Sequence, residues 1–176
     1  YIYMTYSITW DLDSLFNGGI DSPELQARLT LLDQQIKDYT QIVSDWQAEN
    51  DIPDFKQFSN LLAAQELVQN GFGQTLSFVT AIQSADVANK KAGTTLATLY
   101  SKLTDFENAN VVFTKKLTAI SDELWAKLEN TPTLKQHGVS FILNETREHG
   151  KRLLSESDEN IINQLSTDGF TAWSTH

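Results

Sequence analysis

The chain has 176 residues, no cysteine and a formal net charge of −10. This length is sufficient for one domain with a buried core, and the hydrophobic content (40%) and charged content (20%) are ordinary for a globular protein. The negative charge argues against nucleic acid and anionic membranes as partners, because binding to phosphate requires clustered lysine and arginine.

The composition also limits the compartment and the chemistry. Without cysteine the chain forms neither disulfides nor thiolate metal sites, which fits a reducing compartment. There is no run of about 18 apolar residues, so we expect no transmembrane helix. The N-terminus lacks the basic and then apolar pattern of a secretion signal. We therefore expect a cytoplasmic protein that does not contact membranes.

The N-terminal residues 1–20 favour an extended arm. Aromatic or β-branched residues alternate loosely with polar ones as far as Trp10. The arm ends at Asn17-Gly18-Gly19, which has strong turn chemistry.

Two helical segments follow, over 22–50 and 54–89. The first opens with Ser22-Pro23-Glu24, which supplies an N-cap, a first-position proline and an acidic first turn. In the second, Gly71-Phe72-Gly73 is expected to kink or break the helix. Apolar residues recur along 22–50 at steps of four and three, as on a helix face that packs against other helices: Leu25, Leu29, Leu32, Ile36, Tyr39, Val43 and Trp46.

The longest predicted element is a single helix over 94–130. Its expected buried seam, which includes the core candidates Leu103 and Phe113, alternates in steps of three and four: Leu96, Leu99, Leu103, Phe106, Asn110, Phe113, Leu117, Ile120 and Leu124. Such a helix is stable only when its apolar stripe is covered. We expect it to pack antiparallel to the helix over 22–50.

A last helical segment is expected over 138–166. It contains Ser155-Glu156-Ser157-Asp158, which has the spacing of a capping box. Together these segments predict an all-α fold, a bundle of long antiparallel amphipathic helices in a single domain over 1–176.

The residues indicate no catalytic or metal site. Glu145, Glu148 and His149 lie on adjoining positions of a predicted helix and would suit a weak metal site, but a solvated face shared with Arg147, Lys151 and Arg152 is the favoured interpretation. His137 and His176 are not spaced with another histidine as a helical metal site, and Gly71-Phe72-Gly73 lacks the preceding strand of a phosphate loop. Asp11 and Asp13 could form an acid–base pair, but we interpret them as caps or surface charges. The four tryptophans are interpreted as packing anchors: Trp10, Trp46, Trp125 and Trp173.

Residues 153–166 read LLSESDENIINQLS and precede Gly169 and the Ala172 and Trp173 pair. This run resembles a segment of the zinc oligoendopeptidase F family. The opening WDLDSLF at 10–16, followed by two glycines and Ser-Pro-Glu, is similar to the family's N-terminal opening. Trp125 also falls where the family tends to have a tryptophan.

The resemblance implies that this chain is the N-terminal, non-catalytic part of a longer helical metallopeptidase. In that family the two histidines of H-E-x-x-H and a later glutamate hold zinc, and the glutamate of the motif acts on the zinc-bound water. These residues lie in the C-terminal catalytic domain, so none is assigned here, and we expect no cofactor in this part. The implied partners are that catalytic domain and an oligopeptide substrate, whose channel this part would wall.

Two alternatives to this interpretation stay open. One is a free-standing helical module that binds a partner helix along its apolar stripes. The other is a small-ligand sensor built on a helical bundle, which only the tryptophans support.

Overall fold

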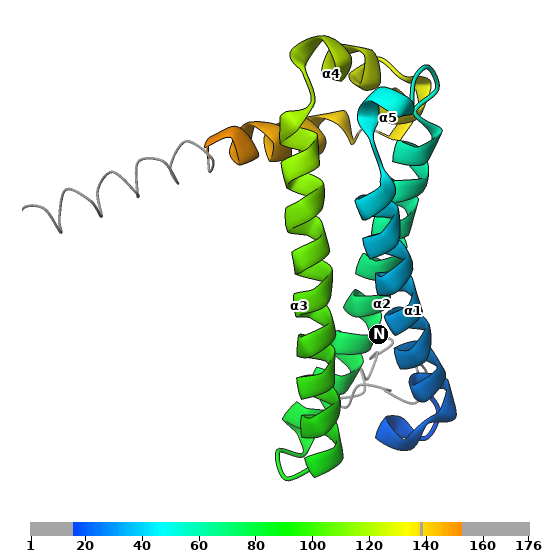
Figure 1. Cartoon of the computed structure of the whole chain (residues 1–176). Helices are drawn as coiled ribbons and strands as arrows, with labels where there is room; N and C mark the ends of the chain where they lie inside the picture. Colours follow the sequence, from blue (N-terminus) through cyan, green and yellow to red (C-terminus); the bar gives the residue numbers. More distant parts are fainter. Residues whose placement is uncertain (1–15, 138, 153–176) are drawn as a thin grey trace, which may run out of the picture. The chain divides into compact units, whose positions relative to one another are not determined.

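The computed structural model describes residues 16–137 and 139–152 (Figure 1). These residues form helices and turns and contain no strand, which confirms the predicted all-α fold. Residues 140–152 are also helical. The labelled elements are η2 (Gly19–Asp21), α1 (Pro23–Asp45), η3 (Ala48–Asn50), α2 (Lys56–Ala85), α3 (Lys90–Ala119), α4 (Asp122–Glu129) and α5 (Pro132–His137).

The chain divides into two compact units, where a single domain was expected. Of the described residues, the first unit contains 16–45 and 59–109, and the second contains 46–58 together with 110–137 and 139–152. The long helices α2 and α3 each contribute residues to both units.

Three helices lie side by side in the first unit (Figure 1). Helices α1 and α2 are antiparallel, because Tyr39 accepts a hydrogen bond from Gln65 at 3.3 Å, whereas Arg28, earlier in α1, donates to Gln74, later in α2. The core contains the Tyr39 and Phe106 rings, whose centroids are 5.3 Å apart. Its other fully buried side chains include Leu25, Leu32, Leu61, Val68, Phe78, Val79 and Leu99.

The expected antiparallel packing of the first helix on the long helix is wrong. Asp21 pairs with Lys91, and Asp33, twelve residues later, pairs with Lys102, eleven residues later. The partners advance in the same direction along both helices, so α1 and α3 are parallel. The reason is that two short connections, one on each side of α2, reverse the chain twice.

The helix expected over 94–130 is divided into α3 and α4. Ser121 leaves the helical conformation at φ −60° and ψ 152°, and its hydroxyl accepts a hydrogen bond from the amide of Leu124 at 3.2 Å. This is N-cap chemistry, strengthened by two acidic residues in the first turn of α4. At the other end, α3 begins at Lys90, earlier than expected, where the side chain of Asn89 accepts from the amide of Ala92 at 3.0 Å.

The expected break at Gly71-Phe72-Gly73 is also wrong, because α2 continues through it. Gly71 is buried against α1, and a Cβ atom there would lie 3.0 Å from Cδ1 of Leu32. Gly71 therefore permits a close approach of two helices within the first unit. The glycines that a turn requires are Gly18 and Gly19, with φ 93° and 66°, at the start of η2.

The other expected boundaries differ in smaller ways. The expected arm over 1–20 lies outside the described residues as far as residue 15, and it ends in a turn and η2. The helix expected over 22–50 ends at Asp45, and the one over 54–89 is α2. Of the segment over 138–166, the described part is helical over 140–152.

The second unit is built around three aromatic rings. The ring centroids of Trp46, Phe58 and Phe113 lie 5.1 to 6.3 Å apart, and all three side chains are buried. The buried carboxylate of Asp51 accepts three hydrogen bonds beside them: from the Trp46 indole at 3.2 Å, and from the amides of Gln57 and Phe58 at 2.9 and 2.8 Å. Asp51 thereby caps the first turn of α2.

Candidate functional site

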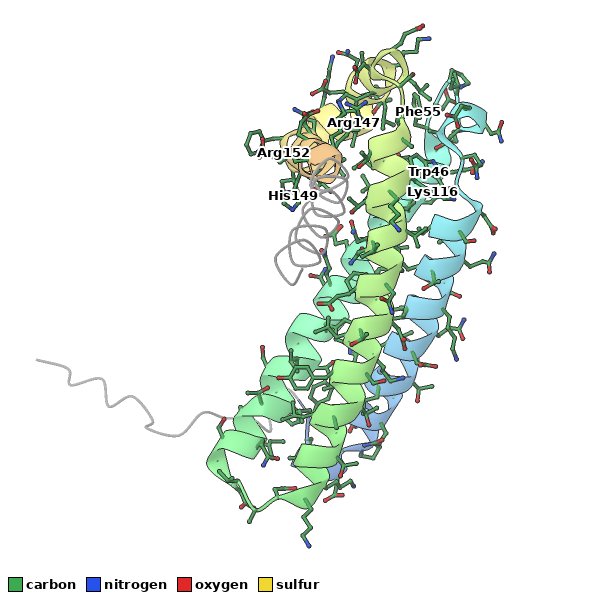
Figure 2. All side chains as sticks on the ribbon, turned by 60° about the vertical axis from the view of Figure 1, so that its left-hand side comes forward. Trp46, Phe55, Lys116, Arg147, His149 and Arg152 are labelled. Carbon is green, nitrogen blue, oxygen red and sulfur yellow. The ribbon has the colours of Figure 1, made fainter. Side chains whose placement is uncertain are left out.

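Arg147 is the most deeply buried charged side chain described in the second unit, at 4% side-chain exposure (Figure 2). Its guanidinium donates to the carbonyl oxygen of Ile120 at 2.6 Å and to a carboxylate oxygen of Asp122 at 2.7 Å. It also lies 5.4 Å from the centroid of the Trp125 ring, within cation–π distance. Arg147 thus fastens the helix over 140–152 to the point where α3 ends and α4 begins.

The groups around Asp122 stabilise the ionised form of its carboxylate. Hydrogen bonds from Arg147 and Lys151 lower the pKa of Asp122. Glu148 accepts a hydrogen bond from Lys151 at 2.9 Å and raises the pKa of that ammonium group. Asp122 and Lys151 are therefore charged at neutral pH, and neither is poised to transfer a proton.

Gly150 allows the same helix to pass close to α3. It is buried, and a Cβ atom built there would overlap the hydroxyl oxygen of Thr118 and lie 3.2 Å from Cγ2 of Thr114. The Thr118 hydroxyl is held in place, since it donates to the Thr114 carbonyl oxygen at 2.7 Å. This crossing and the Arg147 anchor fix the helix over 140–152 within the second unit.

Gly150→Ala is expected to destabilise the protein by about 1–3 kcal/mol, the usual effect of overpacking, despite the better helix propensity of alanine. Urea unfolding followed by circular dichroism measures the change. Gly73→Ala is the control: Gly73 lies inside α2 with nothing within 4 Å of its Cβ position, so stability should rise by up to about 1 kcal/mol. Adding Thr118→Ala should restore part of the loss. Equal effects of the two glycine substitutions would contradict the close crossing.

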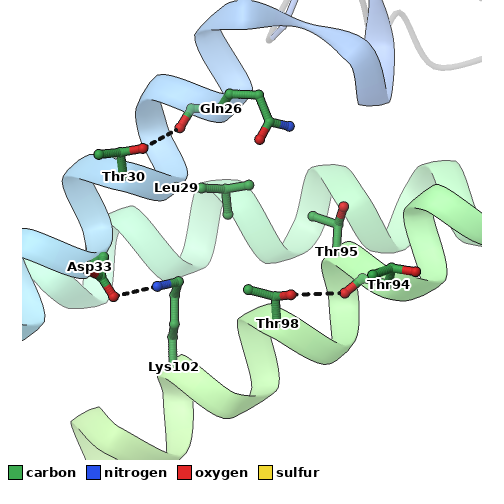
Figure 3. Close-up of a pocket in the computed structure, with 8 residues that line it drawn as sticks. All are labelled: Gln26, Leu29, Thr30, Asp33, Thr94, Thr95, Thr98 and Lys102. Atoms are coloured by element: carbon green, nitrogen blue, oxygen red, sulfur yellow. Dashed lines mark hydrogen bonds and ion pairs between the residues drawn. The ribbon is translucent and has the colours of Figure 1, made fainter.

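A groove runs between α1 and α3 in the first unit and has a volume of about 330 Å³ (Figure 3). The Asp33 and Lys102 ion pair lies at one end, with the Lys102 side chain only 19% exposed. Asp33 also pairs with Lys37 at 2.7 Å. Hydrogen bonds from Lys102 and Lys37 lower the pKa of Asp33 to about 2. The other residues that line the groove are Gln26, Leu29, Thr30, Thr94, Thr95 and Thr98.

The residues that were considered as a metal site lie on the exposed side of the helix over 140–152. Glu145, Glu148 and His149 are exposed, and the described part of the chain contains no group of three histidine, cysteine or acidic residues able to hold a metal ion. Lys151 is half-buried and Arg152 is exposed. The placement of Arg147 on a solvated face is wrong, because its side chain is buried and donates to the carbonyl oxygen of Ile120.

The remaining candidates divide into packing residues and residues that are not described. Trp46 and Trp125 are buried, as packing anchors should be. None of the described helices is long and apolar enough to cross a membrane. Asp11, Asp13, Trp10, Trp173, His176 and the side chain of His137 lie outside the described residues.

Sequence reasoning missed the groove, the Arg147 anchor and the Asp51 cap. The spacing of four residues between Asp33 and Lys37 was a local signal, because it indicates an ion pair on a helix. The partners Lys102 and Ile120 are distant in sequence, and no motif marks them.

Comparison with known families matches residues 116–176 to the N-terminal model of the family described as Oligopeptidase F. The matched segment spans less than half of the chain and is similar to the N-terminal region of that family. The match confirms the resemblance over that part of the chain, and it includes Arg147, Trp125 and Gly150. Searches of curated proteins and of solved structures found no significant match. Within the matched segment the described residues, 116–137 and 139–152, are mostly helical.

Proposed function

We propose that this chain is the N-terminal helical domain of a zinc metalloendopeptidase that hydrolyses oligopeptides. The match of residues 116–176 to the oligopeptidase F family carries this proposal. In it, zinc and the groups that act on the peptide bond belong to a C-terminal catalytic domain, and no residue of this chain is assigned to them. The contribution of this chain is to wall the substrate channel and to pack on the catalytic domain.

Two exposed apolar residues support the packing role. Phe141 and Ile142 are 72% and 64% exposed and lie in the matched segment, on the helix over 140–152. The other face of this helix is buried through Leu143, Arg147 and Gly150. Adjacent exposed apolar side chains of this size are typical of a surface that another protein segment covers.

The experiment combines this chain with the separately produced catalytic domain of the same polypeptide. Each is assayed alone and in the mixture for hydrolysis of a fluorogenic oligopeptide, with and without a metal chelator, and calorimetry measures their association. We expect no chelator-sensitive hydrolysis by this chain alone and a saturable association with the catalytic domain. Chelator-sensitive hydrolysis by the chain alone would overturn the proposal.

A surface variant tests the packing face. The double substitution Phe141→Glu and Ile142→Glu is expected to weaken the association about tenfold or more, because it places charge in an apolar contact. Glu145→Gln, an exposed position on the same helix, is the matched control and should leave the affinity unchanged. If the double variant instead abolishes self-association of this chain in sedimentation experiments and leaves the catalytic domain bound, the face belongs to a free-standing interaction module.

A further inference from the structure

Four threonines line the groove between α1 and α3 (Figure 3). Each of its four threonines donates its hydroxyl proton to the carbonyl oxygen four residues earlier, at 2.9 to 3.1 Å. A hydroxyl group has one proton and two acceptor lone pairs. With the proton used, each threonine oxygen presents only acceptor capacity to the groove, which favours a ligand that supplies N–H donors. These threonines are Thr30, Thr94, Thr95 and Thr98.

The groups on α3 are spaced like the polar groups of an extended peptide. Thr94, Thr98 and Lys102 line the groove at intervals of four residues. At a rise of 1.5 Å per residue, successive groups are about 6 Å apart along the helix axis. In an extended chain the N–H groups that point to one side recur every two residues, roughly 6.4–6.8 Å apart. Two consecutive threonine oxygens therefore match two alternate N–H groups of one peptide.

Lys102, four residues after Thr98 on α3, supplies hydrogen-bond donors to the groove. Asp33 accepts from its ammonium group, which has three N–H donors in all. The charged residues that line the groove are Lys102 and Asp33, and Lys37 pairs with the other oxygen of Asp33 from outside the groove. The N–H donors of Lys102 that Asp33 does not accept can donate to a carboxylate.

The opposite wall supplies an apolar contact. Leu29 belongs to the apolar seam of α1, yet it is only half-buried and lines the groove, whereas its seam neighbours Leu25 and Leu32 are fully buried. A side chain of a bound peptide would cover Leu29. The groove thus offers acceptors, the ammonium group of Lys102 and an uncovered leucine within one unit of the protein.

We infer that this groove binds a short peptide in an extended conformation, with main-chain N–H groups on Thr94 and Thr98 and the terminal carboxylate beside Lys102. The inference rests on the proposed function only for the origin of the peptide. The site lies in the first unit, away in sequence from the Phe141 and Ile142 face of the second unit.

The test is titration calorimetry of the full chain with tetra-alanine, compared with tetra-alanine that ends in a carboxamide. We expect saturable binding of the free acid and about tenfold weaker binding of the amide, because a charge-assisted hydrogen bond to Lys102 is lost. Equal binding of both peptides, or no saturable binding of either, would overturn the inference.

Two matched valine variants test whether the threonines of α3 that line the groove accept hydrogen bonds from the peptide. Thr98→Val should weaken binding of tetra-alanine about fivefold, the effect of one lost hydrogen bond. Thr104→Val is the control, because Thr104 makes the same bond to the carbonyl oxygen four residues earlier but does not line the groove. Equal effects of the two variants would contradict the site. Failure of peptide binding would leave the association with the catalytic domain untouched, so the two proposals fail separately.

Discussion

Replacing Phe113 with alanine is expected to lower the free energy of unfolding by about 3–5 kcal/mol, the usual cost of removing a buried phenylalanine side chain. Phe113 is 3% exposed, and its ring centroid lies 6.3 Å from that of Trp46 and 6.2 Å from that of Phe58. The substitution leaves a cavity in the centre of the second unit. Urea unfolding followed by circular dichroism measures the loss.

Val112→Ala is the control for Phe113→Ala. Val112 precedes Phe113 on α3 but is 43% exposed, so its truncation should change the free energy of unfolding by no more than about 0.5 kcal/mol. Leu103→Ala should fall between the two, because Leu103 is half-buried. A loss below about 0.5 kcal/mol for Phe113→Ala would place the seam on another face of α3.

Asp51→Ala is expected to destabilise the second unit by about 2–4 kcal/mol. The estimate combines the loss of a helix cap, about 0.5–2 kcal/mol, with the cost of leaving a buried indole N–H without a partner, about 1–3 kcal/mol. The buried carboxylate of Asp51 accepts from Trp46, Gln57 and Phe58, so alanine removes three hydrogen bonds at once. Urea unfolding followed by circular dichroism measures the loss.

Asp54→Ala separates this capping role from a general effect of charge. Asp54 lies three residues further along the same connection, with a side chain 63% exposed and a 3.7 Å ion pair to Lys56. Exposed pairs of this kind contribute little, so the free energy of unfolding should change by less than about 0.5 kcal/mol. If the two aspartates cost the same when truncated, the three hydrogen bonds of Asp51 contribute nothing specific.

The apolar periodicity predicted the helical fold and most of the buried face of α3. Leu99, Phe106, Phe113, Leu117, Ile120 and Leu124 are buried as the spacing indicates, whereas Leu96, Leu103 and Asn110 are half-buried. The period of a helix identifies a face, but the depth of burial depends on what packs there. At Leu29, the open groove explains the incomplete burial of a seam residue.

The packing direction and the division of the long helix could not be read from periodicity. The seam continues through Ile120 to Leu124, although Ser121 interrupts the helix between them. The local signal was present in Ser121 and the acidic residues that follow it, since these favour a helix start. The parallel arrangement of α1 and α3 follows from the two chain reversals between them. The apolar spacing within one helix does not indicate how many reversals separate it from another.

The candidate sites depend on pairs of residues that are far apart in the chain. Asp33 meets Lys102 because α1 and α3 lie in a particular register. Arg147 is buried because the break between α3 and α4 presents the Ile120 carbonyl oxygen as an acceptor. On the sequence alone, an arginine among charged neighbours is typical of a solvated helix face, so its role became visible only in the folded structure.

We propose that this chain is the N-terminal part of a zinc oligopeptidase, and the most direct test is to read the native coding frame downstream of His176. We predict an H-E-x-x-H motif followed by a glutamate further on, the ligand set that a catalytic zinc requires. A stop codon directly after His176 would contradict the claim. The chain would then be a self-sufficient helical protein, and the exposed Phe141 and Ile142 would mark a partner of another kind.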